Sequence, residues 1–104
     1  MSQFAAFANA DAASKKQFPY LLVVQSDLIE TTSSRVVVPL ILVERAGGVI
    51  ERLMPRLEVE GKPMVMDTVQ IMSIPGRMLG KQVADLSHER LAIIDAIDML
   101  THGI

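Results

Sequence analysis

Two histidines are the residues of this chain best suited to acid–base chemistry. His88 directly follows Ser87, but neighbours at the start of a helix cannot bring a hydroxyl and an imidazole into the geometry of a nucleophile and its base. His102 has Asp98 one helical turn before it, and a carboxylate at that spacing can orient and charge the imidazole. A histidine in the last turn of a helix also interacts favourably with the helix dipole without any catalytic role. We therefore predict two surface histidines and no catalytic residue.

The glycine-rich stretch Gly76–Gln82 is similar to a phosphate-binding loop but lacks two of its parts. Its glycine spacing is one residue short, and Gln82 stands where such a loop has a Ser or Thr that holds magnesium. The aspartates lack the ligand spacing of a calcium loop, and the two histidines do not stand at metal-binding separation. We predict a connecting loop at residues 76–82, no metal and no cofactor.

The candidate residues at the end of the chain belong to a helix that we predict over about residues 87–102. Ser87 is a suitable N-cap because its hydroxyl can accept a hydrogen bond from a free amide of the first turn. Glu89 places a negative charge near the positive end of the helix dipole. Leu86 and Leu91 have the spacing of a hydrophobic staple across this start.

The predicted helix has an apolar face and a polar face. At about 3.6 residues per turn, the apolar residues that recur every three or four positions share one face, which we expect to be buried. They are Ile93, Ile97, Leu100 and Ile104. The opposite face carries polar residues that we expect to be exposed, namely Asp95, Asp98, Thr101 and His102. Gly103 can take the left-handed conformation that ends a helix.

The part of the chain before this helix, about residues 1–82, is predicted to be a β-rich body. Apolar runs of strand length alternate there with turn residues. The predicted strands cover residues 3–8, 18–24, 35–43 and 56–60, and one or two more lie in 63–74. Breaks are predicted at Gly47–Gly48, at Pro75–Gly76 and at Gly80, and Pro39 marks an edge or a bulge. Gly61–Lys62 supplies the turn of a hairpin. This pattern favours an antiparallel barrel or bent sheet with the helix packed at one end.

Two further groups of apolar residues are interpreted from the sequence around them. The Leu28–Ile29 pair falls inside a polar turn, and the residues alone leave two interpretations open: a core contact beneath the loop, or an exposed pair that binds a partner. The methionines Met64, Met66 and Met72 lie in strand-like sequence and are interpreted as core filling.

The composition limits the class of protein. The chain has 104 residues, half of them hydrophobic, and a formal charge of −2, which suits one domain over residues 1–104. A chain of this size hides only about two-thirds of its unfolded surface, so dimerisation would add burial. Few aromatic residues and a mildly acidic charge argue against general nucleic-acid binding. Zero cysteines suit a reducing cytosol. The longest apolar run is too short to span a bilayer, and residues 4–10 lack the basic segment of a signal peptide, so we expect no membrane segment.

Five blocks of the sequence together resemble the CcdB toxin family. They occur in order over nearly the whole chain, and the resemblance fails only in the Ala-rich loop after the first predicted strand and around Gly47–Gly48. The blocks are Val24-Gln25-Ser26-Asp27-Leu28-Ile29, Arg35-Val36-Val37-Val38-Pro39-Leu40, Met72-Ser73-Ile74-Pro75, Val83-Ala84-Asp85-Leu86-Ser87-His88 and Ala96-Ile97-Asp98 with the closing Gly103-Ile104.

This resemblance implies a fold and a function. The fold is a mainly β (α+β), SH3-like antiparallel barrel with a small added sheet and a long C-terminal α-helix, forming a symmetric homodimer in the bacterial cytoplasm. The function is that of a toxin that binds the A subunit of DNA gyrase and traps the enzyme on cleaved DNA. A CcdA-type antitoxin neutralises the toxin, and the pair represses its own operon, so operator DNA is contacted only through the antitoxin complex.

The resemblance also implies which residues contact gyrase. They are the last three, His102, Gly103 and Ile104, supported by Asp98, Thr101, Leu28 and Ile29. The best-known family pattern ends Trp-Gly-Ile, with the tryptophan stacked on a gyrase arginine, and this chain has His102 instead. An imidazole offers a smaller face than an indole, so losing about 1 kcal/mol of stacking would weaken binding several-fold or more.

Two other functions stay open at this point. The same barrel is used by ribonuclease toxins of the MazF and Kid type, which need a proton-transfer set on the sheet face, and no histidine precedes His88 here. The third alternative is an inactive toxin relative retained for antitoxin binding, which would bind antitoxin tightly without arresting growth.

Overall fold

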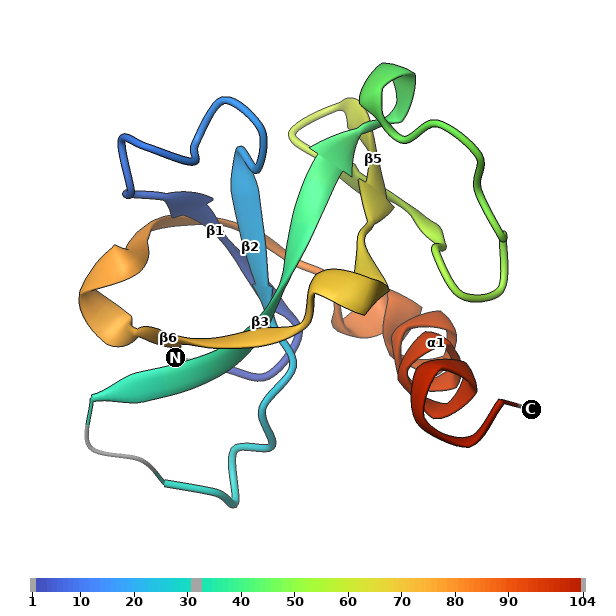
Figure 1. The fold of residues 1–104 in the computed structure, drawn as a ribbon. Helices are drawn as coiled ribbons and strands as arrows, with labels where there is room; N and C mark the ends of the chain where they lie inside the picture. The colour runs from blue at the N-terminus through green and yellow to red at the C-terminus, as the bar shows by residue number, and fades with distance from the viewer. Residues whose placement is uncertain (1, 31–32, 104) are drawn as a thin grey trace.

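A curled antiparallel sheet with one C-terminal helix makes up the fold (Figure 1). The computed structural model describes residues 2–30 and 33–103. The strands are β1 (Ala5–Asn9), β2 (Tyr20–Val23), β3 (Ser34–Leu42), β4 (Arg56–Val59), β5 (Lys62–Met66), β6 (Met72–Pro75) and β7 (Leu79–Asp85), and the helix is α1 (Arg90–His102). The prediction of a mainly β chain that ends in a helix is confirmed. No helix of the described residues is long and apolar enough to cross a membrane.

The strands follow the order β4-β5-β3-β2-β1-β7, and β6 also pairs with β3. The long β3 has two neighbours on one side. Its first half pairs with β6 through residues such as Arg35 and Ile74, and its second half pairs with β5 through residues such as Ile41 and Val65. In Figure 1, β6 and β5 lie beside different halves of β3, and the sheet curls into a half-barrel.

Pro39 lies inside this sheet, so the predicted edge or bulge is wrong. Its register with Leu21 of β2 is continuous, and its carbonyl accepts a hydrogen bond from the Asp67 amide at 3.0 Å on the other side. The nitrogen and the carbonyl of one strand residue point the same way, so the missing N–H of Pro39 also points to that side. On that side the strand beside β3 changes from β6 to β5, and no residue of either strand pairs with Pro39. The missing N–H therefore removes no hydrogen bond from the sheet.

Apolar side chains on the two faces of the sheet form two separate clusters. Successive strand residues point to opposite faces, and β1 illustrates this because Ala6 belongs to the first cluster while Ala5 and Phe7 belong to the second. Helix α1 covers the first cluster with Ile93 and Ala96, both fully buried. The methionines were correctly predicted as core filling. Met64 and Met66 are fully buried, and Met72 is half-buried against the second cluster.

The predicted hairpin is confirmed, but its two-residue turn lies one residue earlier than predicted, at Glu60 and Gly61, and Lys62 already belongs to β5. Both residues have positive φ, 52° and 77°, as the turn that suits the twist of two antiparallel strands requires. The hydroxyl of Tyr20 in β2 donates to Glu60 Oε1 at 2.9 Å, which ties the turn to the body.

The stretch predicted as a connecting loop at residues 76–82 is largely a strand. After a short 3-10 turn, Gly76–Met78, β7 begins at Leu79 and pairs with β1. Gly80 lies within β7, where a Cβ would come within 3.0 Å of the Ala8 carbonyl oxygen. The strand is therefore not broken at Gly80, contrary to the prediction, but its pairing with β1 shifts register between residues 79 and 82, and the glycine allows the two strands to approach closely there.

The start of the helix also differs from the prediction. Residues Ser87–Glu89 form a 3-10 turn, and no side-chain cap is made by Ser87; instead Asp85 Oδ1 accepts a hydrogen bond from the Ser87 amide at 2.9 Å. This bond lowers the pKa of Asp85. The predicted staple is wrong, since Leu86 is buried but Leu91 is 77% exposed.

The two faces of the helix agree with the prediction over the described residues. Ile93 is buried, Ile97 and Leu100 are half-buried, and Ile104 lies outside the described residues. Gly103 has a φ of 74° and donates its amide hydrogen to the Met99 carbonyl at 2.9 Å, which confirms it as the left-handed residue that ends the helix.

Candidate functional site

The Leu28–Ile29 pair lies on the surface, in the loop between β2 and β3. Leu28 is 91% exposed and Ile29 is 60% exposed. Of the two interpretations left open by the sequence, the core contact is therefore wrong. Isolated exposed aliphatic residues are common, so exposure alone does not identify a binding site. What distinguishes this pair is the network of polar side chains that holds it in place.

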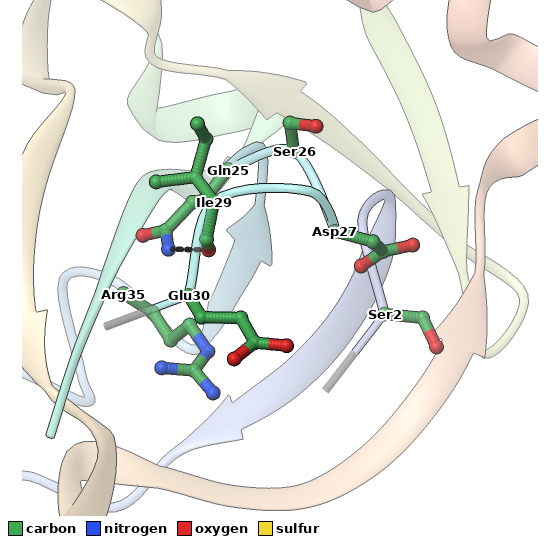
Figure 2. A pocket seen from close by; sticks show the side chains of 7 residues that line it. All are labelled: Ser2, Gln25, Ser26, Asp27, Ile29, Glu30 and Arg35. Carbon is green, nitrogen blue, oxygen red and sulfur yellow. Dashed lines mark hydrogen bonds between the residues drawn. The ribbon is translucent and has the colours of Figure 1, made fainter. Parts of the chain in front are cut away.

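Three consecutive polar residues build that network, and each uses its side chain. Gln25 donates from Nε2 to the Ile29 carbonyl at 2.8 Å, the bond drawn in Figure 2. Ser26 Oγ accepts the Leu28 amide hydrogen at 3.1 Å. Asp27 Oδ1 accepts the amide hydrogen of Gln3 at 2.9 Å, which ties the loop to the start of the chain. The loop thus has a defined shape although its apolar side chains contact solvent.

A polar hollow of about 400 Å³ lies beside this loop. Figure 2 shows its lining residues: Ser2, Gln25, Ser26, Asp27, Ile29, Glu30 and Arg35. The exposed Ile29 therefore lies next to a mainly polar surface, as residues at the rim of a protein–protein contact do.

The second group of predicted site residues lies at the C-terminal end of α1. Asp98, Thr101 and His102 are exposed, as predicted, and Gly103 follows them. The Thr101 hydroxyl donates to the Ile97 carbonyl at 3.0 Å, and His102 Nδ1 lies 3.0 Å from the same hydroxyl oxygen. The His102 imidazole thus lies against the Thr101 hydroxyl, and the direction of this hydrogen bond depends on the tautomer of the imidazole.

Next to this helix end, Arg52 forms a bidentate ion pair with Asp95, which no sequence pattern predicts. Arg52 Nε and Nη2 donate to the two carboxylate oxygens at 2.8 and 3.0 Å, and both side chains are about half exposed. The bond from Arg52 lowers the pKa of Asp95. Together with Asp98 and His102, the pair lines an open groove of about 600 Å³. The two partners are 43 residues apart, and no local pattern marks such a pair.

The family to which the chain belongs follows from a comparison with protein-family models. The model described as "CcdB protein" matches residues 3–103 of the 104-residue chain. The chain belongs to the CcdB family. The resemblance inferred from the five sequence blocks is confirmed by this match.

The five CcdB-like blocks occupy connected parts of the structure. Residues 24–29 belong to the loop that carries the Leu28–Ile29 pair. Residues 35–40 and 72–75 lie in β3 and β6, which pair with each other. Residues 83–88 cover the end of β7 and the turn before the helix, and the last block lies at the end of α1. The two places where the resemblance fails are loops.

The CcdB-like site residues fall into two groups that one chain does not bring together. In Figure 1 the loop after β2, in cyan, lies at the lower left, and the C-terminal end of α1, in red, lies at the right. Ile104, predicted as a contact residue, lies outside the described residues.

The other candidate residues are the histidine at the start of the helix and the side chains that could hold a metal. His88 is exposed, so the prediction of a surface histidine holds for both histidines. Within residues 2–30 and 33–103, His, Cys, Asp and Glu side chains form no group of three that could hold a metal ion.

Proposed function

We propose that this protein is the toxin of a toxin–antitoxin module and that it acts by binding the A subunit of DNA gyrase and trapping gyrase on cleaved DNA. The CcdB family match over residues 3–103 carries this proposal. Under it the protein has no catalytic residue of its own, and its effect depends on the surface that it presents to gyrase.

Two exposed groups of side chains form that surface. The first is the Leu28–Ile29 pair, whose defined loop lowers the entropy lost when a partner binds. The second is the helix end, with Asp98, Thr101 and His102 followed by Gly103 and Ile104. Apolar side chains supply buried area, and the polar groups of the helix end fix orientation.

The protein acts as a homodimer. The gyrase A subunits form a two-fold pair of arms, and a two-fold ligand matches such a target. In such a dimer the two helix ends can lie together at the dimer axis. The curled sheet then corresponds to an SH3-like barrel with a small added sheet, and residues 1–104 form one toxin domain in the bacterial cytoplasm.

A CcdA-type antitoxin neutralises the toxin. Operator DNA is bound through the antitoxin complex, in which the pair represses its own operon. The toxin itself is mildly acidic, with a formal charge of −2, and this charge does not favour direct binding to a phosphate backbone.

Calorimetric titration with the arm-forming fragment of gyrase A tests the proposal. We expect one toxin dimer to bind per fragment dimer, and a variant that lacks Gly103 and Ile104 to lose the binding heat. Ile29→Ala should weaken binding about tenfold, the loss expected when an apolar side chain carries a substantial share of the binding energy.

Ile50→Ala is the matched control, because Ile50 is 56% exposed and lies outside both groups. It should bind like the unaltered protein. If neither the full chain nor any variant binds the fragment, gyrase is not the target, and cleavage of RNA by the purified protein together with antitoxin binding would identify the alternative.

A further inference from the structure

The Leu28–Ile29 pair is not anchored in the core, although Val24 at the start of its loop packs against the first apolar cluster. With Leu28 91% exposed and Ile29 60% exposed, neither side chain anchors the loop in the core. The pair can be presented in one geometry only if polar contacts fix the backbone. Ser26 Oγ accepts a hydrogen bond from the Leu28 amide, and Asp27 Oδ1 accepts one from the amide of Gln3 near the start of the chain.

Gln25 joins the part of this loop around Ile29 to strand β3 of the sheet. Its Oε1 accepts the amide hydrogen of Val36 in β3 at 3.0 Å, and its Nε2 donates to the Ile29 carbonyl at 2.8 Å. One side-chain amide therefore bridges a central strand and the backbone of an exposed apolar residue. Figure 2 shows the Gln25 side chain reaching across the loop to Ile29.

We propose that Gln25 is a positioning residue, which holds the Leu28–Ile29 pair in the orientation that its protein partner binds. The proposal rests on the proposed function, in which this pair contacts gyrase. Gln25 affects binding through Ile29: its side-chain amide holds the Ile29 backbone, and therefore the loop, in place before the partner binds.

The chemistry of the bridge requires a side-chain amide. Val36 needs an acceptor and the Ile29 carbonyl needs a donor, and Gln supplies both at the ends of one planar group. A glutamate has the same size and keeps the acceptor for Val36. When ionised it has no hydrogen to donate, so it repels the Ile29 carbonyl. Gln25→Glu thus removes the link to the loop and keeps the link to the strand.

Nuclear magnetic resonance of the full-length Gln25→Glu protein tests the positioning directly. We expect the Leu28 and Ile29 amides, which are bonded within the loop, to exchange at least tenfold faster, while the Val36 amide keeps its protection. Below a pH of about 4 the new carboxyl is protonated and regains a donor. The loop chemical shifts should then return toward those of the unaltered protein, which simple loss of packing would not produce.

Gln17→Glu is the matched control, because Gln17 is exposed in another loop and the variant has the same charge change. It should leave the Leu28 and Ile29 signals unchanged. If Gln25→Glu also leaves their exchange and shifts unchanged, the positioning role is wrong whatever the protein binds.

Titration with the gyrase A fragment then connects positioning to binding. Gln25→Glu should weaken binding about tenfold or more, and the double variant with Ile29→Ala should lose less than the sum of the two single losses, because Gln25 acts partly through Ile29. Weakening by Ile29→Ala but not by Gln25→Glu overturns the positioning role and leaves the proposed function intact. If Ile29→Ala and the truncation both bind normally, gyrase remains the target but the proposed contact surface is wrong, and the resonance experiment still decides whether Gln25 holds the loop. If the unaltered protein does not bind the fragment, the proposed function itself is wrong.

Discussion

At the scale of single residues, the structure separates aliphatic side chains that fold the protein from those that are free to contact a partner. Ile93 is fully buried beneath α1, whereas Leu28 is 91% exposed on a loop. Burial of an aliphatic side chain stabilises a fold by about 1.5–3 kcal/mol, and exposure of Leu28 forgoes that gain. The hydrogen bonds of Gln25 and Ser26 hold the loop in the absence of burial.

The imidazole of His102 should contribute to gyrase binding by stacking. We expect His102→Trp to strengthen binding of the gyrase A fragment several-fold or more, because an indole offers a larger face to a guanidinium. His102→Ala should weaken binding. Calorimetric titration measures both, and His88→Ala, which removes the other exposed histidine, should have no effect. Equal affinities of all three variants would contradict a stacking role.

The ion pair between Arg52 and Asp95 should be visible in a titration. Its hydrogen bonds keep the pKa of Asp95 below the ordinary carboxyl value of about 3.9. A lowered pKa in the folded state means that the pair stabilises the protein above that ordinary value, and that this contribution is lost as pH falls through the folded pKa.

Carbon-detected resonance of the Asp95 carboxyl measures this pKa. Arg52→Gln should raise it toward the ordinary value, and Arg56→Gln, at another exposed arginine, should not change it. An identical Asp95 titration in Arg52→Gln and the unaltered protein would show that the pair does not persist in solution.

At the scale of helices and strands, two contacts between neighbouring segments depend on residues to which sequence patterns assign other roles. Gly80, which reads as a break, lies inside β7 and lets it approach β1. Asp85, at the end of that strand, accepts the Ser87 amide hydrogen and takes the place of the expected serine cap. The first contact lies within the sheet, and the second lies between the sheet and the helix.

A side chain at position 80 should disturb the pairing of β7 with β1. In Gly80→Ala the new Cβ would lie 3.0 Å from the Ala8 carbonyl oxygen, and one strand has to shift. Overpacking of this kind costs about 1–3 kcal/mol. Chemical denaturation should show that loss, whereas Gly48→Ala, where the Cβ meets open space, should change stability by less than about 0.5 kcal/mol. Equal stability of both variants would mean that the two strands are less closely spaced than described.

At the scale of the whole molecule, the helix is held on the sheet by a small number of side chains. Ile93 and Ala96 are its fully buried residues, and they belong to the apolar cluster that includes Leu22 and Leu40 of the central strands. The helix end that carries His102 is therefore positioned by contacts made one to three turns earlier.

Truncation of Ile93 should test this dependence. Ile93→Ala removes a fully buried side chain at the helix–sheet contact and should cost about 2–5 kcal/mol of unfolding free energy. Leu91→Ala, two residues earlier but 77% exposed, should cost less than about 0.5 kcal/mol. Denaturant unfolding of both variants gives the comparison. A similar loss in both would contradict the assignment of the buried face.

The sequence by itself determined those features that depend on neighbouring residues. The hairpin around Glu60 and Gly61, the apolar strands, the buried face of the helix and the helix end at Gly103 follow from periodicity and from the backbone preferences of single residues. The blocks that mark the CcdB family could be read in the same way, since a family pattern is itself a property of the sequence.

The tertiary structure alone decided which of these residues meet and which face solvent. Whether Leu28 is buried depends on whether another element covers its loop, and the pairing of Arg52 with Asp95 joins residues 43 positions apart. Gly80 could be placed in a strand only once β1 was known to lie beside it. Burial, long-range ion pairs and close backbone approach depend on contacts between distant segments, and local patterns carry no information about those contacts.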